Sequence, residues 1–360
     1  MVDDLQMMRR ALFHAARAQG GTAPNPLVGA VVVDAGGVVV GQGYHERAGD
    51  PHAEVVALDA AGGHGRGATM YVTLEPCCHT GRTGPCTERI LAAGVARVVV
   101  ATRDPDPRVS GGGIARLRDA GLVVNVGLEE VTARRLNAAF MAAHERGRPL
   151  VVLKAATSRD GRIAAAPGVR SALSGTEAAR RTQMLRAATD AIAVGGGTIL
   201  VDDPLLTVRD VVRTRPYTRV IFDRRLRTPA SARVLATQAS GPVLVVTSAQ
   251  ALAKHRERAR ALRATGAECL VADTLDEACR QLVRHDVHTL LVEGGAALHK
   301  AFWDAGLVDR VHLVVAPAVV GHAGVPLFDG YPLPWSRLTG LTAQPCGKDV
   351  WIEADVHWNR

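Results

Sequence analysis

Aromatic residues are scarce in this chain, at 4% of 360 residues, and no block of five or more consecutive basic residues occurs. Proteins that bind single-stranded nucleic acid need stacking aromatics beside basic grooves, so this composition argues against that class. No run of 18 apolar residues is present, and no transmembrane helix is expected. The acidic start Met1-Val2-Asp3-Asp4 lacks a signal-peptide pattern, so we expect a cytoplasmic protein.

The chain is instead rich in small apolar residues and arginine. Hydrophobic residues make up 47% and charged residues 22%, which is typical of a globular protein with a sizeable core. A net charge of +8 suits small phosphorylated substrates and cofactors. The length suits two domains, and Arg146-Gly147-Arg148-Pro149 is the clearest break in the pattern. We therefore expect domains at 1–146 and 147–360.

Three soft metal ligands stand out in the first domain. The six cysteines are reduced or metal-bound in such a chain, and His52 with Cys77 and Cys86 gives the three-ligand count that leaves a zinc position open for water. Glu54 follows the histidine by two residues, and a nearby carboxylate can move the protons of that water. The alternative is a closed structural zinc site, with Cys78 or His79 as the fourth ligand.

The order of these residues matches the signature of the zinc deaminases, H-x-E followed by P-C and a later C, in which the glutamate is the general acid and base. The spacing differs, because eight residues separate Cys77 from Cys86 where the commoner pattern has two. His52 and Glu54 should lie in the first turn of a helix that begins near Asp50-Pro51, and Cys86 at the start of another.

Hydrophobic periodicity predicts alternating strands and helices in both halves, which is typical of layered α/β domains. Strands are expected at 30–34, 38–44, 69–74, 95–101, 122–126, 150–155, 191–194, 219–222, 243–247, 268–272, 289–292 and 310–316. Helices are expected at 5–19, 87–93, 114–120, 129–145, 176–188, 249–264, 275–285 and 296–305.

Two glycine-rich turns follow strands of the second half, at Gly195-Gly196-Gly197 and at Gly294-Gly295. Such turns let backbone N–H groups approach a phosphate, although each one alone is more often a tight turn. The G-x-G-x-x-G fingerprint of ordinary dinucleotide-binding folds is absent.

The chain resembles the bifunctional deaminase-reductase family of riboflavin biosynthesis over nearly its whole length. The first half is similar through Pro24 to Gly29, Gly43-Tyr44-His45, His52-Ala53-Glu54, Glu75 to Cys86 and Asp104 to Pro107, and the second through Leu153 to Arg162, Thr198 to Arg209 and Glu293-Gly294-Gly295. The long spacing from Cys77 to Cys86 belongs to this family.

For the first half, the resemblance implies a cytidine-deaminase-like three-layer α/β/α domain. His52, Cys77 and Cys86 would bind Zn²⁺, and Glu54 would carry the proton in the hydrolytic deamination of a diaminopyrimidinone ribosyl phosphate. The family's substrate contacts fall at Asn25, His45, His79, Arg82 and Asp104.

For the second half, it implies a dihydrofolate-reductase-like α/β domain that uses NADPH to reduce the ribosyl chain to ribityl. The family's cofactor contacts fall at Ala156, Thr198, Asp202, Gly295, Ala296 and Ala297. Its substrate contacts fall at Arg186, Leu206, Arg209 and Glu293, and Lys154 could sit beside the reacting centre.

One departure concerns cofactor binding. The family usually has Ser-x-Trp-Ile-Ser/Thr before the helix at 176–188, whereas this chain has Ala172 at the tryptophan position. Losing that aromatic surface removes a stacking partner worth on the order of 1 kcal/mol. We expect a homo-oligomer, dimer or tetramer, that acts on a small phosphorylated pyrimidine. The alternative is a nucleic-acid or nucleotide base deaminase with a non-catalytic C-terminal module.

Overall fold

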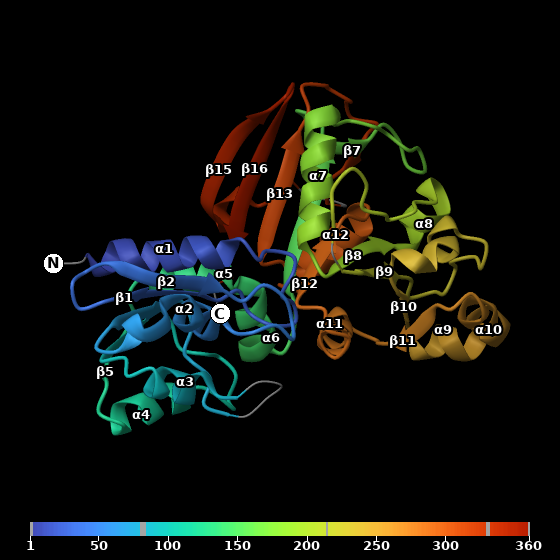
Figure 1. The fold of residues 1–360 in the computed structure, drawn as a ribbon. Coiled ribbons are helices and arrows are strands. Elements are labelled where there is room, and N and C mark those ends of the chain that lie inside the picture. Colours follow the sequence, from blue (N-terminus) through green and yellow to red (C-terminus); the bar gives the residue numbers. More distant parts are fainter. Residues whose placement is uncertain (1–2, 80–83, 214, 329–331, 359–360) are drawn as a thin grey trace. The chain divides into compact units, whose positions relative to one another are not determined.

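The computed structural model describes residues 3–79, 84–213, 215–328 and 332–358 (Figure 1). The chain forms two compact units, Met1–Gly147 and Arg148–Arg360. The α/β architecture that periodicity predicted is confirmed in each of them. Among the described helices, none combines the length and the apolar character that crossing a membrane requires.

The first unit is built on a mixed sheet in the order β2-β1-β3-β4-β5 within the described residues. β1 is antiparallel to both β2 and β3, whereas β3, β4 and β5 run parallel. The parallel part places the carboxyl ends of β3 and β4 at the same edge. The strands are β1 Gly29–Val33, β2 Val39–Tyr44, β3 Thr69–Val72, β4 Arg97–Val100 and β5 Val123–Val126.

Helices cover both faces of this sheet, which confirms the three-layer arrangement. Alternate strand residues face opposite ways, so Val31 and Val99 pack against α1 and α5 while Val32 and Val98 pack against α2, α3 and α4. The helices are α1 Asp4–Ala16, α2 Ala53–Ala61, α3 Cys86–Ala92, α4 Gly112–Asp119, α5 Glu130–Leu136 and α6 Ala138–Arg146, with a 3₁₀ turn η1 at Gly62–Gly65.

The second unit is built on a larger sheet in the order β11-β10-β9-β8-β12-β6-β13-β16-β15 within the described residues. Its strands are parallel from β11 to β13, and the antiparallel hairpin β16-β15 extends it. The strands are β6 Leu150–Thr157, β8 Ala191–Gly195, β9 Thr218–Phe222, β10 Val243–Thr247, β11 Glu268–Val271, β12 Thr289–Val292, β13 Arg310–Val315, β15 Leu338–Cys346 and β16 Asp349–Val356, and a separate short pair joins β7 Arg162–Ala164 to β14 Val325–Pro326.

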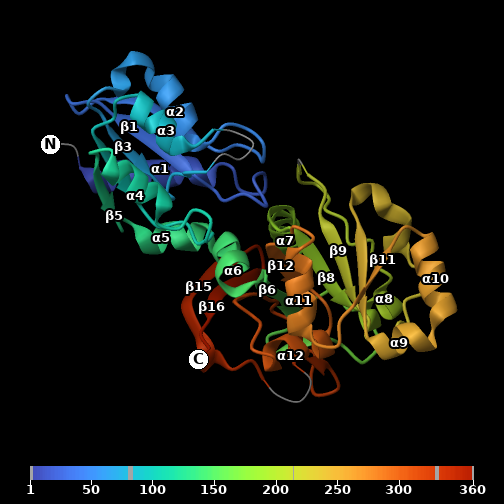
Figure 2. The ribbon, with the colours of Figure 1, turned by 90° about the horizontal axis from the view of Figure 1, so that it is seen from below.

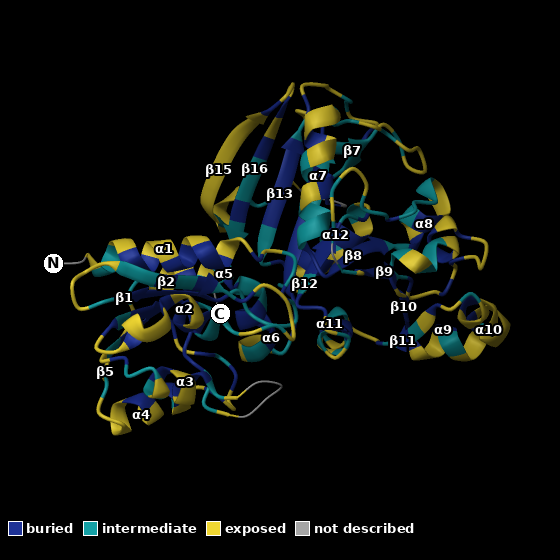
Figure 3. Ribbon diagram, in the orientation of Figure 1, coloured by how far each residue is buried: buried dark blue, intermediate teal, exposed yellow. Residues whose placement is uncertain are grey.

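Buried strands lie between helices in this unit as well (Figure 3). Helices α11 and α12 pack on one face of the central strands, whereas α8, α9 and α10 pack on the other, with α10 beside β11 (Figure 2). Helix α7 packs on β13 and β16, where its residue Ala178 lies in one cluster with Val314 of β13 and Trp351 of β16. The helices are α7 Thr176–Ala188, α8 Gly196–Asp202, α9 Ala249–Lys254, α10 Arg256–Ala264, α11 Leu275–Val283 and α12 Ala296–Asp304, with 3₁₀ turns η2 Arg233–Ser240 and η3 Trp335–Arg337.

Two helices predicted as continuous are each divided in the structure. The predicted helix 129–145 breaks at Asn137, whose side chain accepts a hydrogen bond from the Leu27 N–H and donates one to the Leu27 carbonyl. The predicted helix 249–264 breaks at His255, where the backbone has φ −118° and ψ 48°. The first break is a tertiary effect, because its cause lies more than a hundred residues away in the sequence.

Candidate active sites

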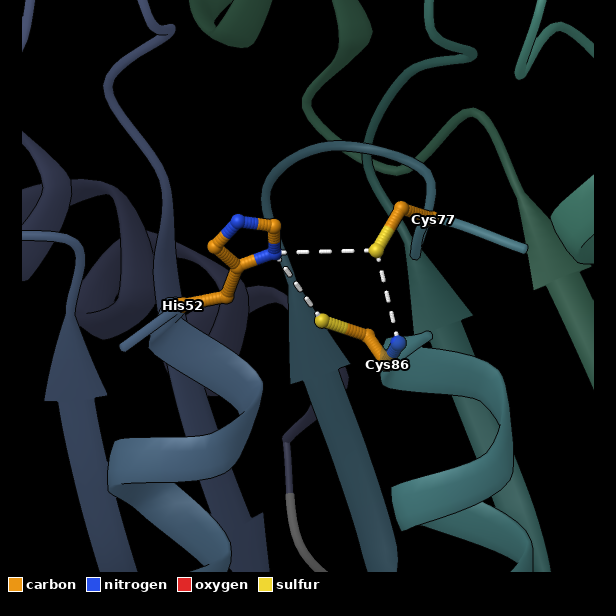
Figure 4. A group of neighbouring side chains, drawn as sticks. All are labelled: His52, Cys77 and Cys86. Atoms are coloured by element: carbon orange, nitrogen blue, oxygen red, sulfur yellow. Dashed lines mark hydrogen bonds between the residues drawn. The ribbon is translucent and has the colours of Figure 1, made fainter. Parts of the chain in front are cut away.

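The three predicted zinc ligands converge in the first unit (Figure 4). His52 caps the start of α2, Cys77 follows β3, and Cys86 is the first residue of α3. His52 Nδ1 lies 3.1 Å from Cys86 Sγ and 3.6 Å from Cys77 Sγ. One imidazole nitrogen and two thiol sulfurs within 4.8 Å of one another form a donor set that fits zinc and leaves a fourth position for another ligand.

The hydrogen bond between the two thiols moves their pKa values in opposite directions, lowering that of Cys77 and raising that of Cys86. Hydrogen bonding with Cys86 lowers the pKa of the Cys77 thiol, and the Cys86 backbone N–H donates to Cys77 Sγ at 3.3 Å. The thiolate is the form that binds a metal, so the Cys77 side is prepared for one. Neither Cys78 nor His79 joins the group. The Cys78 sulfur lies beside Gly112, and His79 is exposed.

Glu54 lies in the first turn of α2, two residues after His52, the N-cap residue of that helix. Its side chain is buried, and this burial raises its pKa to about 7. A carboxyl group with a pKa near neutrality can both accept and release a proton at physiological pH.

Two of the predicted substrate contacts, Asn25 and His45, are hydrogen-bonded to each other, and His45 lies beside His52. His45 Nδ1 donates to the Pro51 carbonyl at 3.2 Å, so its Nε2 accepts from the Asn25 amide at 3.0 Å. The His45 ring lies 5.5 Å from the His52 ring, edge to face. Burial lowers the pKa of His45, so the ring is held neutral beside the ligands.

Asp104 follows β4 and is buried, and this burial raises its pKa to about 6. Its Oδ1 accepts a hydrogen bond from the Asp106 N–H at 2.8 Å. Its own N–H donates to Glu75 Oε2 at 3.3 Å, a contact that sequence reasoning missed. The signal available for Glu75 was its position just before Pro76-Cys77. Arg82 lies outside the described residues.

In the second unit, Lys154, Arg186 and Glu293 come together from three elements. Because Leu153 pairs with Val292 on neighbouring parallel strands, the next residues, Lys154 and Glu293, reach the same sheet edge. Arg186, near the end of α7, donates to Glu293 through Nε at 2.8 Å and Nη2 at 2.6 Å. Its Nη1 donates to the Thr207 carbonyl at 3.1 Å.

These three partly buried charges shift one another's pKa values. Burial acts to raise the pKa of Glu293, but the positive charges of Arg186 and Lys154 prevail and lower it. Burial lowers the pKa of Lys154, against the attraction of Glu293. His299, on the first turn of α12, is also buried, and this burial lowers its pKa to about 4. Sequence reasoning assigned no role to His299.

The two glycine turns meet at the carboxyl ends of β8 and β12, which are neighbours. A Cβ on Gly294 would lie 2.6 Å from the Gly195 nitrogen, so the backbones touch and only glycine fits. Thr198 Oγ1 accepts from the Gly295 N–H at 3.3 Å, whereas the space beside Gly197 is open. Within the described residues, Asp202 Oδ1 is buried without a hydrogen-bond partner. The backbone N–H groups at the starts of α8 and α12 fit a phosphate group, and Asp202, the last residue of α8, has a carboxylate oxygen that fits a hydroxyl group of the same cofactor.

The remaining predicted residues of the second unit occupy nearby elements. Ala156 lies on β6, two residues after Lys154, and Ala296 and Ala297 begin α12. The other two lie on the segment after α8, where the Leu206 carbonyl accepts from the Tyr217 hydroxyl and the Arg209 side chain is exposed.

Comparisons with known proteins cover both units. The family model "Cytidine and deoxycytidylate deaminase zinc-binding region" matches residues 1–102, and "RibD C-terminal domain" matches residues 149–352. The riboflavin biosynthesis protein RibD of Aquifex aeolicus is 42% identical over 88% of this chain and 88% of its own length. The chain belongs to the RibD family.

Solved structures of the RibD family agree along the whole chain. RibD of Acinetobacter baumannii has a TM-score of 0.88 at 35% identity and covers 99% of both chains. A diaminohydroxyphosphoribosylaminopyrimidine deaminase/5-amino-6-(5-phosphoribosylamino)uracil reductase of Thermotoga maritima has a TM-score of 0.85 at 32% identity, covering 98% of this chain and 99% of its own.

Membership of the RibD family settles the type of enzyme. The chain is a bifunctional enzyme of riboflavin biosynthesis, with a zinc-dependent deaminase domain followed by an NADPH-dependent reductase domain, as the resemblance predicted. It acts on a small phosphorylated pyrimidine. A base deaminase with a non-catalytic second half is not favoured, because the second half itself matches the RibD C-terminal domain.

Proposed function

We propose that the first unit deaminates 2,5-diamino-6-(5-phosphoribosylamino)pyrimidin-4(3H)-one and that the second unit then reduces the ribosyl chain of the product to ribityl. The observation that carries the proposal is the convergence of His52, Cys77 and Cys86 beside the buried carboxyl group of Glu54. The activities named for the Thermotoga maritima relative support both steps.

In the deaminase step, His52, Cys77 and Cys86 would hold the zinc ion. When bound, zinc lowers the pKa of a water molecule beside the reacting carbon. Glu54 would take a proton from the attacking water and pass a proton to the departing amino group, so that a C–O bond forms, the C–N bond breaks and ammonia leaves. The pKa of Glu54, raised to about 7 by burial, suits both transfers.

The substrate would be oriented by polar groups around the ligands. Asn25 and His45 form one pair, joined by the hydrogen bond between Asn25 Nδ2 and His45 Nε2. Asp104 stands at the neighbouring strand end and offers a carboxyl group to the pyrimidine. His79 and Arg82 are proposed to contact the ribosyl phosphate, because an imidazole and a guanidinium can both donate hydrogen bonds to phosphate oxygens.

In the reductase step, NADPH supplies a hydride when bound. Lys154 Nζ is proposed to hydrogen-bond the opened ribose and donate a proton, which its lowered pKa makes easier. Glu293 holds Lys154 charged and contacts the substrate. Arg186 fixes Glu293 through two hydrogen bonds, and Arg209, together with the Leu206 backbone, is proposed to bind the substrate near its phosphate.

The cofactor would occupy the cradle at the ends of β8 and β12. The backbone N–H groups from Gly295 to Ala297 are proposed to contact its phosphates, and Thr198 fixes that turn. Asp202, whose Oδ1 is buried without a partner within the described residues, is proposed to accept a hydrogen bond from a ribose hydroxyl. Ala156 would line the pocket from β6.

Both halves can be tested on the full chain loaded with zinc. Ammonia release is measured with the diaminopyrimidinone, and NADPH oxidation is measured with its deaminated product. A strong zinc chelator should abolish ammonia release and leave NADPH oxidation unchanged. Folded protein that oxidises no NADPH with the deaminated product would overturn the reductase half. Ammonia release that survives verified loss of zinc would overturn the deaminase half.

Three expectations stay predictions from the sequence: a domain boundary at 146/147, a homo-oligomer and a cytoplasmic location. Analytical ultracentrifugation of the full chain measures the oligomeric state. Limited proteolysis tests the boundary, because a domain junction is cleaved before the folded domains on either side.

A further inference from the structure

Glu75 is a buried carboxylate that no step of the proposed chemistry uses. It lies between β3 and the ligand Cys77, and it is only 3% exposed. Its backbone N–H donates to the Thr102 carbonyl at 3.0 Å, so the carboxyl ends of β3 and β4 are joined there. A charged side chain in such a position needs partners that offset the cost of removing it from water.

The partners of Glu75 are backbone N–H groups of one segment, residues 104–114. Oε2 accepts from Asp104 at 3.3 Å and from Gly111 at 3.0 Å, and Oε1 accepts from Ile114 at 3.1 Å. The last two belong to the N-terminal turn of α4, where unpaired N–H groups favour a negative charge. One side chain therefore fastens both ends of the segment.

Backbone packing reinforces this attachment. A Cβ on Gly113 would lie 1.9 Å from the Pro76 carbonyl oxygen, so the segment touches the chain directly before Cys77. Asp104 is joined by a hydrogen bond to Glu75, which lies two residues before Cys77. Burial first, and then the charges of Asp106, Glu75 and Cys77, raise its pKa to about 6.

We propose that Glu75 is a positioning residue of the deaminase: its carboxylate holds the segment 104–114 against the strand end that carries Cys77, and so sets Asp104 in place beside the zinc ligands. This inference rests on the proposed role of Asp104 in binding the substrate. Glu75 touches neither substrate nor metal, and it acts on substrate affinity through the loop.

The test is Glu75→Gln in the zinc-loaded full chain. A carboxamide has one acceptor oxygen, and its NH₂ group faces backbone N–H donors, so part of the attachment is lost. The deaminase KM should rise about tenfold, which corresponds to the loss of one buried hydrogen bond, while kcat changes less than threefold. Zinc content and NADPH oxidation should stay at wild-type values. Glu75→Asp, which keeps the carboxylate, should recover part of the KM.

Two further variants distinguish the effect of the position of segment 104–114 from the effect of the Glu75 side chain itself. Gly113→Ala drives the segment away from Pro76 with Glu75 intact, and it should raise KM in the same way. Glu88→Gln is the matched control, because Glu88 also bonds the segment's helix, through Arg116 at 3.0 Å, but at an exposed position. It should leave KM unchanged.

The outcomes separate this inference from the proposed function. If Asp104→Ala leaves KM unchanged, the substrate role of Asp104 is wrong. If Asp104→Ala raises KM while both Glu75→Gln and Gly113→Ala leave it unchanged, the positioning role of Glu75 alone is overturned. It is equally overturned if Glu75→Gln loses zinc and the zinc-loaded fraction keeps the wild-type KM, because Glu75 would then support the metal site.

Discussion

The two sites of this enzyme are assembled in different ways. The deaminase group uses residues between His52 and Cys86, two of them at helix starts, and its central contacts join an imidazole to thiols. The reductase group joins Lys154, Arg186 and Glu293, which are spread over 140 positions, through a paired arginine and glutamate. The residues of the first site therefore come from one short stretch of sequence, whereas the order of the strands in the sheet brings together the residues of the second.

This difference predicts how activity and stability respond to substitutions at each site. A ligand group at helix starts keeps its geometry when a neighbouring side chain changes, so substitutions there should alter chemistry more than stability. A buried ion pair holds its surroundings together, so a substitution that leaves one charge unpaired should destabilise the unit. All four tryptophans lie in the second unit, at 303, 335, 351 and 358, so their fluorescence reports the unfolding of that unit alone.

The largest expected effect is on deamination, with Glu54→Gln. The amide cannot carry the proton, so deaminase kcat should fall about a thousandfold, within the range for loss of a general acid and base. Zinc content and NADPH oxidation should be unchanged. Steady-state ammonia release measures the effect, with Glu88→Gln as an exposed control in the same unit. A variant that keeps deaminating at the wild-type rate would show that another group moves the proton.

The next effect is on stability, with Glu293→Gln in the reductase unit. It leaves the guanidinium of Arg186 buried without its charge partner, at a cost of about 3 kcal/mol. Urea unfolding followed by tryptophan fluorescence measures the change, and deaminase activity should be unaffected. Asp276→Asn removes an exposed pair with Arg280 and should cost less than about 1 kcal/mol. An equal loss of unfolding free energy in the two variants would show that the pair of Arg186 and Glu293 stabilises the unit no more than an exposed pair does.

A pH dependence of similar size should arise from His299. Burial lowers the pKa of His299 from 6.5 to about 4, so below pH 6.5 the unfolded chain binds a proton on this ring more tightly than the folded chain does. The free energy of unfolding of the second unit should therefore decrease as pH falls from about 6.5 to 4, by roughly 3 kcal/mol. Urea unfolding at both pH values tests this, and His299→Leu should remove most of that decrease.

The smallest effect concerns the cofactor, with Ala172→Trp. Ala172 is exposed and stands where the family usually has tryptophan. An aromatic surface there should add about 1 kcal/mol of stacking, which corresponds to a KM for NADPH about fivefold lower. The KM for the pyrimidine serves as the internal control. An unchanged KM for NADPH would mean that the loop of this chain does not reach the cofactor.

The sequence predicted most of the regular structure, because periodicity reports which face of a strand or helix is buried. The helix at 176–188 and the strands at 243–247 and 289–292 agree with the structure to the residue. The hairpin of β15 and β16 was missed. β15 is exposed along nearly its whole length (Figure 3), so its sequence carries no alternation of buried and exposed residues.

The candidate site of the first unit could be predicted because its residue types are unusual: a histidine, a glutamate and two cysteines in a fixed order. The contacts that orient these residues could not be predicted. The attachment of Glu75 to Asp104 and the pairing of Arg186 with Glu293 depend on which strands become neighbours. The helix break at Asn137 depends on its contact with Leu27, which no local sequence pattern predicts.

By itself, the sequence predicted the candidate ligands, and it determined the glycine turns and the alternation that gives two α/β units. Only the tertiary structure decided which buried charges meet, how the loop at Asp104 is held and which way each pKa moves. The physical reason is that residue type and short-range periodicity are local properties, whereas burial and electrostatic pairing depend on residues that the fold brings together from distant positions.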